Sequence, residues 1–145
     1  MVDALDIVGD RYTLPIVREI TYGYRRFNEI AAYTGAPRNL LTGRLRRLEE
    51  AGVLERRQYS ERPARYEYRL TEAGRDLLPI VQGLKEWGER HGGRDEPIVV
   101  FEHSCGAEFH PVTVCAACRE PVDPGSLEIV GGSNPPVPKP AAGAA

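Results

Sequence analysis

The chain has 145 residues, 41% of them hydrophobic, which is enough for one compact domain with a real core and a small appendage. No stretch approaches the roughly 20 apolar residues of a membrane-spanning helix, and no basic-then-apolar signal segment opens the chain, so the sequence predicts a soluble, cytoplasmic protein with no membrane partner. The net charge of −2 excludes a uniformly basic protein, but residues 36–69 hold nine Arg against five Glu, and residues 70–145 hold six basic against eleven acidic side chains.

The first predicted helix spans residues 13–23. Thr13 is its expected N-cap, Pro15 is tolerated in the first turn, and Gly23 ends it. Three apolar residues fall on one side: Leu14, Val17 and Ile20. We expect this helix to contribute to the core.

Two more helices and a tight turn follow. Residues 27–32 predict a short helix, residues 33–37 hold a Gly and a Pro that favour a turn, and residues 38–51 predict a second helix. The second helix carries leucines at i, i+4 and i+7, which share one buried face: Leu41, Leu45 and Leu48. A short helix, a glycine turn and a basic helix in this order are typical of a helix-turn-helix motif.

The opposite face of the 38–51 helix is polar and basic, and it carries Arg38, Asn39, Thr42, Gly43, Arg46 and Arg47. In helix-turn-helix docking the N-terminal half of the second helix enters the major groove, where Arg pairs with guanine and Asn with adenine. An ordinary solvated helix face is the alternative interpretation. Arg44 lies close to the leucines, so we interpret it as an ion-pair residue and not as a base contact.

A hairpin is predicted next. Residues 53–59 and 65–70 alternate in polarity and are joined by residues 60–64. Such a wing, at about residues 59–66, is expected to bring Arg62 and Arg65 to the DNA backbone or the minor groove.

Four segments taken in order resemble the HxlR-type winged helix-turn-helix regulators: residues 6–14 (DIVGDRYTL), 25–30 (RRFNEI), 41–49 (LTGRLRRLE) and 63–71 (PARYEYRLT). The resemblance covers about residues 1–91. It implies a bacterial transcription regulator that binds double-stranded DNA as a two-fold dimer, with the terminal helices forming the dimer contact. Tyr12 is a departure, because the family usually has Trp there.

The last predicted helix of the winged domain runs from its N-cap Thr71 to about His91, and Pro79 should kink or break it. Its apolar residues cover a wide arc: Leu77, Leu78, Ile80, Val81, Leu84 and Trp87. One small core does not need so wide an arc, so we predict a homodimer in preference to a helix buried within the monomer. A dimer would place the two recognition helices, one from each chain, one DNA turn apart.

Residues 92–97 predict a linker, and residues 98–130 a small β-rich module that resembles a degenerate zinc ribbon. The expected ligands of a structural Zn²⁺ are His103, Cys105, Cys115 and Cys118, with His110 as the competing fourth ligand. Two alternatives remain open. The thiols of Cys105, Cys115 and Cys118 form a redox sensor, with Cys115 and Cys118 as a pair, or they are inert. Residues 131–145 predict a disordered tail.

The predicted fold is therefore mainly α with a small β-hairpin wing, followed by a small β-rich module. No sequence motif favours an enzyme. The function predicted from the sequence is that of a dimeric, sequence-specific DNA-binding regulator, and a winged-helix and zinc-ribbon protein-interaction adaptor is the alternative. A small-molecule effector is expected between the terminal helix and the DNA-reading domain, where we expect four aromatic residues to lie close together: Tyr12, Tyr22, Tyr24 and Trp87.

Overall fold

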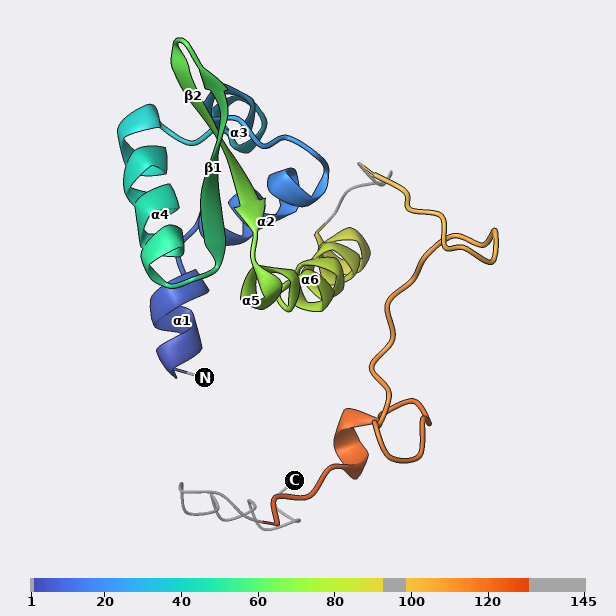
Figure 1. Cartoon of the computed structure of the whole chain (residues 1–145). Coiled ribbons are helices and arrows are strands. Elements are labelled where there is room, and N and C mark those ends of the chain that lie inside the picture. The colour runs from blue at the N-terminus through green and yellow to red at the C-terminus, as the bar shows by residue number, and fades with distance from the viewer. Residues whose placement is uncertain (1, 93–98, 131–145) are drawn as a thin grey trace. The chain divides into compact units, whose positions relative to one another are not determined.

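A computed structural model describes residues 2–92 and 99–130 of the chain (Figure 1). The chain divides into two units, Met1–Pro111 and Val112–Ala145, and each is described by itself. The predicted linker 92–97, apart from Gly92, and the predicted tail 131–145 lie outside the described residues, so the predicted domain boundaries stay a prediction. Within the described ranges, no helix has the length and apolar character needed to cross a membrane.

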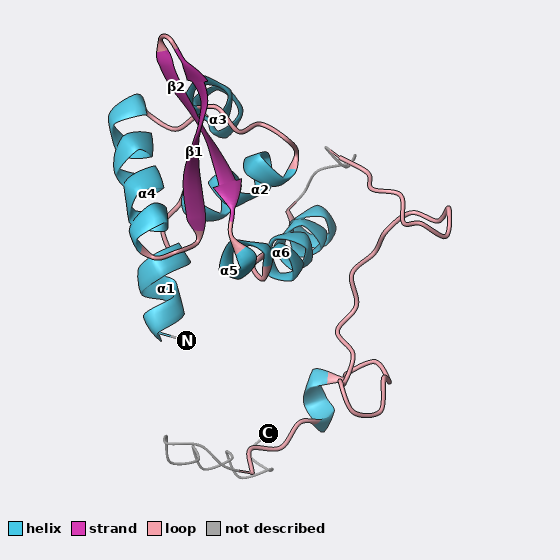
Figure 2. Cartoon of the chain, in the orientation of Figure 1, coloured by secondary structure: helices cyan, strands magenta, loops and turns pink. Residues whose placement is uncertain are grey.

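The first four helices are α1 (Val2–Val8), α2 (Thr13–Thr21), α3 (Phe27–Thr34) and α4 (Arg38–Glu50), as Figure 2 shows. The helix-turn-helix prediction is therefore confirmed to within two residues at each end. Gly35 ends α3 in the left-handed conformation (φ 65°), which glycine adopts without strain. One core joins α2, α3 and α4 to the hairpin and the last helix, and its buried members are Ile16, Val17, Ile20, Ile30, Ala36, Leu41, Leu45, Leu48, Val53, Leu54 and Val81.

The predicted N-cap of α2 is wrong by one residue. Thr13 lies inside the helix and is 1% exposed, and the N-cap residue is Tyr12, whose side chain makes no capping hydrogen bond. The Thr13 N–H already donates to the Asp10 carbonyl at 3.1 Å. The turn before the helix thus supplies an acceptor for an N–H group that a capping side chain would otherwise have to bind.

The predicted wing is confirmed as the antiparallel hairpin of β1 (Leu54–Glu61) and β2 (Ala64–Leu70). Its pairing runs from Leu54 opposite Leu70 to Glu61 opposite Ala64, with an irregularity between Gln58 and Ser60 that marks a bulge. Figure 1 shows α4 lying alongside this hairpin.

The hairpin is joined to the helix-turn-helix by two backbone hydrogen bonds. The Tyr68 N–H donates to the Arg25 carbonyl at 2.8 Å, and the Val53 N–H donates to the Leu48 carbonyl at 2.9 Å. The first bond connects β2 to the segment before α3, and the second connects the end of α4 to the start of the hairpin. Both ends of the motif are thus fixed to the wing.

The predicted helix over residues 71–91 forms two helices, α5 (Glu72–Arg75) and α6 (Leu78–His91). Thr71 is the N-cap of α5 as predicted, and its hydroxyl accepts from the Gly74 N–H at 3.1 Å. The expected break also occurs, and its position follows from Pro79. A proline has no N–H for the carbonyl four residues earlier, and its ring clashes with that carbonyl. Arg75 is that residue, and α5 ends there.

The β-rich character predicted for residues 98–130 is not shown. Residues 99–130 form two isolated β-bridges, Glu102 with Glu108 in the first unit and Val114 with Pro121 in the second, and no strand ladder. The regular element in this range is the short 3₁₀ helix η1 (Pro124–Ser126), which the Asp123 carboxylate caps by accepting from the Gly125 N–H at 3.0 Å. No side chain in residues 99–130 is buried, so local turns dominate these segments.

Candidate DNA-binding surface

One face of α4 is exposed and carries every residue that the sequence predicted for the reading helix: Arg38, Asn39, Thr42, Gly43, Arg46 and Arg47. The leucines on the opposite face are buried, with Leu41 at 0% and both Leu45 and Leu48 at 1% exposure. A Cβ added at Gly43 would meet no atom within 4 Å, so the middle of this face is open. The packing of the leucines therefore fixes which side chains face outward.

Arg38, at the start of this face, is held by α3. Its Nη2 donates to Asn28 Oδ1 at 2.9 Å, and its guanidinium lies over the Phe27 ring, 4.9 Å from the centroid. These contacts restrict a side chain that would otherwise be free to rotate. Asn28 was missed from the sequence, because its partner lies ten residues away and only the turn between α3 and α4 brings them together.

Arg46 and Arg47 lie further along α4 and differ in what holds them. Arg46 Nε donates to Glu50 Oε1 at 2.8 Å in a pair on the helix surface, with 79% and 59% of the side chains exposed. Arg47 reaches Asp10 at 3.5 Å. Both ion pairs are exposed to solvent. Each guanidinium group can therefore leave its carboxylate for another hydrogen-bond acceptor at a small cost in free energy.

Arg44 forms an ion pair with Asp10, as its position beside the leucines predicted. Its Nη2 donates to Asp10 Oδ1 at 2.6 Å, and 21% of its side chain is exposed. Its Nε is buried and has no hydrogen-bond partner within the described residues. Asp10 precedes α2, so this pair fixes the α1–α2 connection to the middle of α4.

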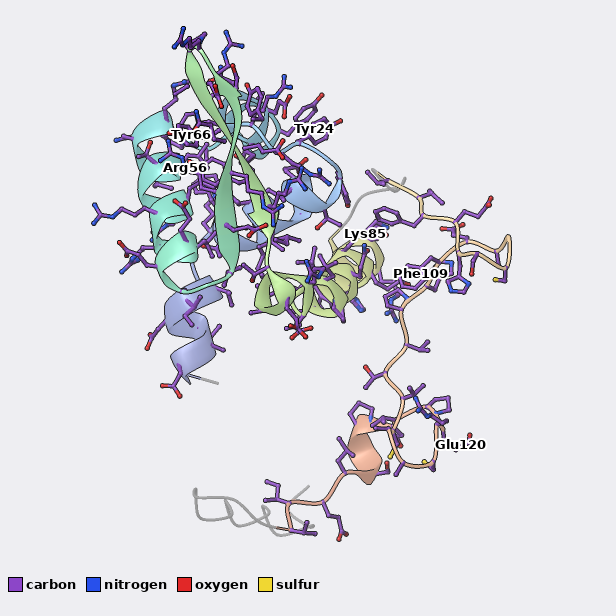
Figure 3. The ribbon with its side chains drawn as sticks, in the orientation of Figure 1. Tyr24, Arg56, Tyr66, Lys85, Phe109 and Glu120 are labelled. Atoms are coloured by element: carbon purple, nitrogen blue, oxygen red, sulfur yellow. The ribbon has the colours of Figure 1, made fainter. Side chains whose placement is uncertain are left out.

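The predicted wing arginines lie at the tip of the hairpin, Arg62 in the turn and Arg65 in β2, and both are exposed. No described carboxylate lies within ion-pair distance of either. Behind the tip, Arg56 stacks on the Tyr66 ring at 3.7 Å from the centroid, and Figure 3 shows the two side chains next to one another. Arg56 was not predicted as a site residue, because its contact depends on the strand register.

Arg26, which precedes α3, completes the basic surface. Its guanidinium lies 4.8 Å from the centroid of the Tyr59 ring, at the hairpin bulge. The Glu29 carboxylate accepts from the Arg25 and Arg26 backbone N–H groups at 3.1 and 3.0 Å. This local network fixes the start of α3 beside the wing.

The predicted metal ligands occur as two pairs in different units. His103 Nδ1 lies 3.3 Å from Cys105 Sγ in the first unit, and Gly106 follows with φ 83°. His110 is near Glu86, with its Nδ1 3.4 Å from Oε2. No group of three or more metal-ligating side chains gathers in residues 2–92 and 99–130. The zinc site therefore stays a prediction.

In the second unit, Cys115 and Cys118 form a tight turn. The Arg119 N–H donates to the Cys115 carbonyl at 2.8 Å, and Arg119 adopts the left-handed conformation with φ 65°. Hydrogen bonds from the backbone N–H groups of Cys118 and Ala117 lower the pKa of the Cys115 thiol. All three cysteines are free thiols in the structure.

Comparison with known proteins relates the chain to a family of helix-turn-helix proteins. The sequence profile described as HxlR-like helix-turn-helix matches residues 7–96. The chain is 46% identical over 121 residues to the uncharacterized HTH-type transcriptional regulator Rv3095 of Mycobacterium tuberculosis, covering 82% of this chain and 77% of that protein.

Solved structures agree with this result. The structure of PA1374 from Pseudomonas aeruginosa, a candidate transcription factor, is 30% identical, covers 92% of each chain and has a TM-score of 0.63. The reduced form of the redox regulator HypR is 37% identical, with a TM-score of 0.57 over 62% of this chain and 90% of that one. The match of the profile to more than half of the chain shows that this protein belongs to the HxlR-like helix-turn-helix family.

Proposed function

We propose that the protein is a homodimeric, sequence-specific transcription regulator that inserts α4 into the major groove of double-stranded DNA. The observation that carries this proposal is the exposed face of α4, where basic and amide side chains stand opposite three buried leucines. Asn39 and Arg46 carry the groups that pair with adenine and guanine edges. The wing arginines, Arg62 and Arg65, supply phosphate or minor-groove contacts.

The proposed dimer uses the apolar surface of α1 and α6. On α6, Ile80, Leu84 and Trp87 are 52%, 51% and 61% exposed, and on α1 Leu5 is 55% exposed. A groove of about 680 Å³ lies between these helices and α2. Single exposed apolar residues are common, but a continuous row on the terminal helices supports a contact with a second copy.

The test measures DNA binding by fluorescence anisotropy, with a duplex that the protein itself selects from a random library. Arg46→Ala should lose about 1–3 kcal/mol of discrimination at one base pair. Arg65→Ala should instead weaken binding to all sequences alike and lower the slope of log K against log salt by about one. Arg90→Ala is the matched control, since Arg90 is an exposed arginine in the last turn of α6.

The proposal is wrong if Arg46→Ala and Arg65→Ala both keep the affinity and the specificity of the unmodified protein. An affinity for the selected duplex that does not change with salt would also contradict it, because phosphate contacts release counterions. That second result would favour the adaptor hypothesis, in which the winged domain docks on a protein.

Structural zinc on His103, Cys105, Cys115 and Cys118 remains a second proposal, supported by the sequence spacing and by the donor set of one imidazole and three thiolates. Each turn, taken by itself, supports it too. A residue in the left-handed conformation follows the cysteine in both, Gly106 in the first and Arg119 in the second. Four protein ligands would make the metal structural. A thiol redox sensor is the alternative, which the lowered pKa of Cys115 and the redox regulator HypR among the similar structures support.

A further inference from the structure

A pocket of about 640 Å³ lies between α2, α3 and α6 in the first unit. Its lining residues include Glu19, Tyr22, Tyr24, Tyr33, Leu84 and Lys85. The sequence predicted an aromatic pocket here, and Tyr22 and Tyr24 do line it, whereas Tyr12 and Trp87 do not. Figure 3 labels Tyr24, from the α2–α3 connection, and Lys85, from α6. A cavity of this size accommodates a small organic molecule.

The pocket contains a buried carboxylate. The Glu19 side chain is 4% exposed, and its Oε1 accepts from Arg18 Nε at 2.8 Å. Its Oε2 accepts no hydrogen bond from a described residue, although Glu19 lines the pocket. A ligand that covers this carboxylate displaces the water around it, so a ligand that donates a hydrogen bond to Glu19 binds more tightly than one that does not.

The aromatic wall includes a stacked pair of rings. The rings of Tyr24 and Tyr33 stack with their centroids 3.8 Å apart and an angle of 22° between their planes. Tyr22 contacts Phe101, with the ring centroids 5.5 Å apart. Offset stacking on such rings favours a planar aromatic ligand.

The charged groups around the pocket are already paired. Arg18 neutralises Glu19, and Lys85 Nζ donates to Glu89 Oε2 at 2.8 Å. The lining therefore has no surplus charge with which to hold an ion. A neutral ligand enters without leaving a charge unpaired.

We propose that this pocket binds a neutral, planar aromatic molecule with a hydroxyl or amine donor for Glu19, and that this molecule is the effector of the regulator. The pocket walls come from α3, which belongs to the helix-turn-helix, and from α6, which belongs to the proposed dimer surface. A ligand that contacts both elements can favour one arrangement of them over another. The effector role rests on the proposed function, whereas binding of the ligand does not.

The binding test uses the full chain and 2-naphthol as the probe, with 2-methoxynaphthalene as its partner without a donor, in isothermal titration calorimetry at pH 7. One molecule of 2-naphthol should bind per chain. The methyl ether should bind about tenfold more weakly or worse, because it leaves Glu19 Oε2 without a donor. Equal affinity for the two compounds, or no binding of 2-naphthol, would overturn the proposal.

Gly88→Leu fills the pocket, since Gly88 lines it and a Cβ there would meet nothing within 4 Å. Gly83→Leu is the matched control, because Gly83 lies in the same helix, has the same open space and lines neither this pocket nor the groove beside α1. Gly88→Leu should lower the 2-naphthol affinity at least about tenfold, as expected when a side chain must be displaced. If Gly83→Leu has the same effect, or Gly88→Leu has none, the ligand binds elsewhere.

The effector role has its own readout. Saturating 2-naphthol should change the affinity for the selected DNA duplex about fivefold or more in the unmodified protein, and not in Gly88→Leu. An unchanged DNA affinity with the pocket occupied would refute the effector role. Failure of the DNA-binding proposal is distinguishable, because it would show in the absence of any ligand.

Discussion

The ion pair between Asp10 and Arg44 allows a quantitative test of how α4 is held. Asp10→Asn keeps the shape of the side chain and removes its charge, so that Arg44 faces a neutral amide. In the unmodified protein, Arg44 Nη2 donates to Asp10 Oδ1 at 2.6 Å, and the side chains of Arg44 and Asp10 are 21% and 34% exposed. Removing one partner of a fully buried pair costs about 3–5 kcal/mol, and an exposed pair contributes at most about 1 kcal/mol. For a pair that is partly exposed, we expect the free energy of unfolding to fall by about 2 kcal/mol.

The assay is urea denaturation followed by the fluorescence of Trp87, the one tryptophan of the chain, at a fixed protein concentration. Glu55→Gln is the matched control, because Glu55 pairs with Arg57 at 2.7 Å on the open surface and should cost less than about 0.5 kcal/mol. In the double variant Asp10→Asn with Arg44→Met, the free energy of unfolding should fall by less than the sum of the two single decreases. The reason is that the double variant leaves no Arg44 charge without its carboxylate partner. Equal losses for the two charge-to-amide variants, or strict additivity in the double variant, would refute the reasoning.

Three further predictions concern other parts of the chain. Thr71→Ala should lower the free energy of unfolding by about 1 kcal/mol in the same denaturation assay, because the cap on the Gly74 N–H is lost, whereas Thr71→Ser should keep it; equal losses would exclude capping as the cause. Trp87→Glu should convert the proposed dimer to a monomer in sedimentation velocity, because a charge would enter the proposed apolar contact, while Glu72→Gln on the neighbouring helix α5 should leave the mass unchanged. A dimer that survives Trp87→Glu would place the contact elsewhere. Metal analysis should find about one zinc per chain, and Cys118→Ser should lose it; a metal-free protein would leave thiol chemistry as the role of the cysteines.

The winged helix-turn-helix was predictable because its signals are local. The leucines of α4 recur with the helical period, and a glycine and a proline separate α4 from α3, so both helices and their buried face follow from the sequence alone. Arg44 was also interpreted correctly, because its angular position beside the leucines decides its environment. Gly35 ends α3 as expected for a residue that tolerates the left-handed conformation.

What could not be predicted depends on distant partners. Thr13 has a cap-forming side chain, but the preceding turn draws it into the helix. The sequence indicates only an ordinary surface residue at Asn28, because the turn between α3 and α4 is what brings Arg38 to it. Arg56 contacts Tyr66 only in the register that the hairpin adopts. Glu19 is nearly fully buried in α2, a helix that packs against α3, β2 and α6, and no local pattern indicates this burial. The β-rich module was predicted from the strand-like run of residues 98–101 and from the cysteine spacing, and that spacing specifies turns but not strands.

The two backbone hydrogen bonds from Val53 and Tyr68 have a consequence for the kind of DNA that the protein selects. They join the wing to α4 at one end and to the start of α3 at the other. The angle between the recognition helix α4 and the wing is therefore already fixed in the DNA-free protein. A duplex whose grooves do not match that angle must bend or change its groove width to be bound, and the energy of this deformation depends on base sequence. Base pairs that no side chain touches would then contribute to selectivity through the stiffness of the duplex.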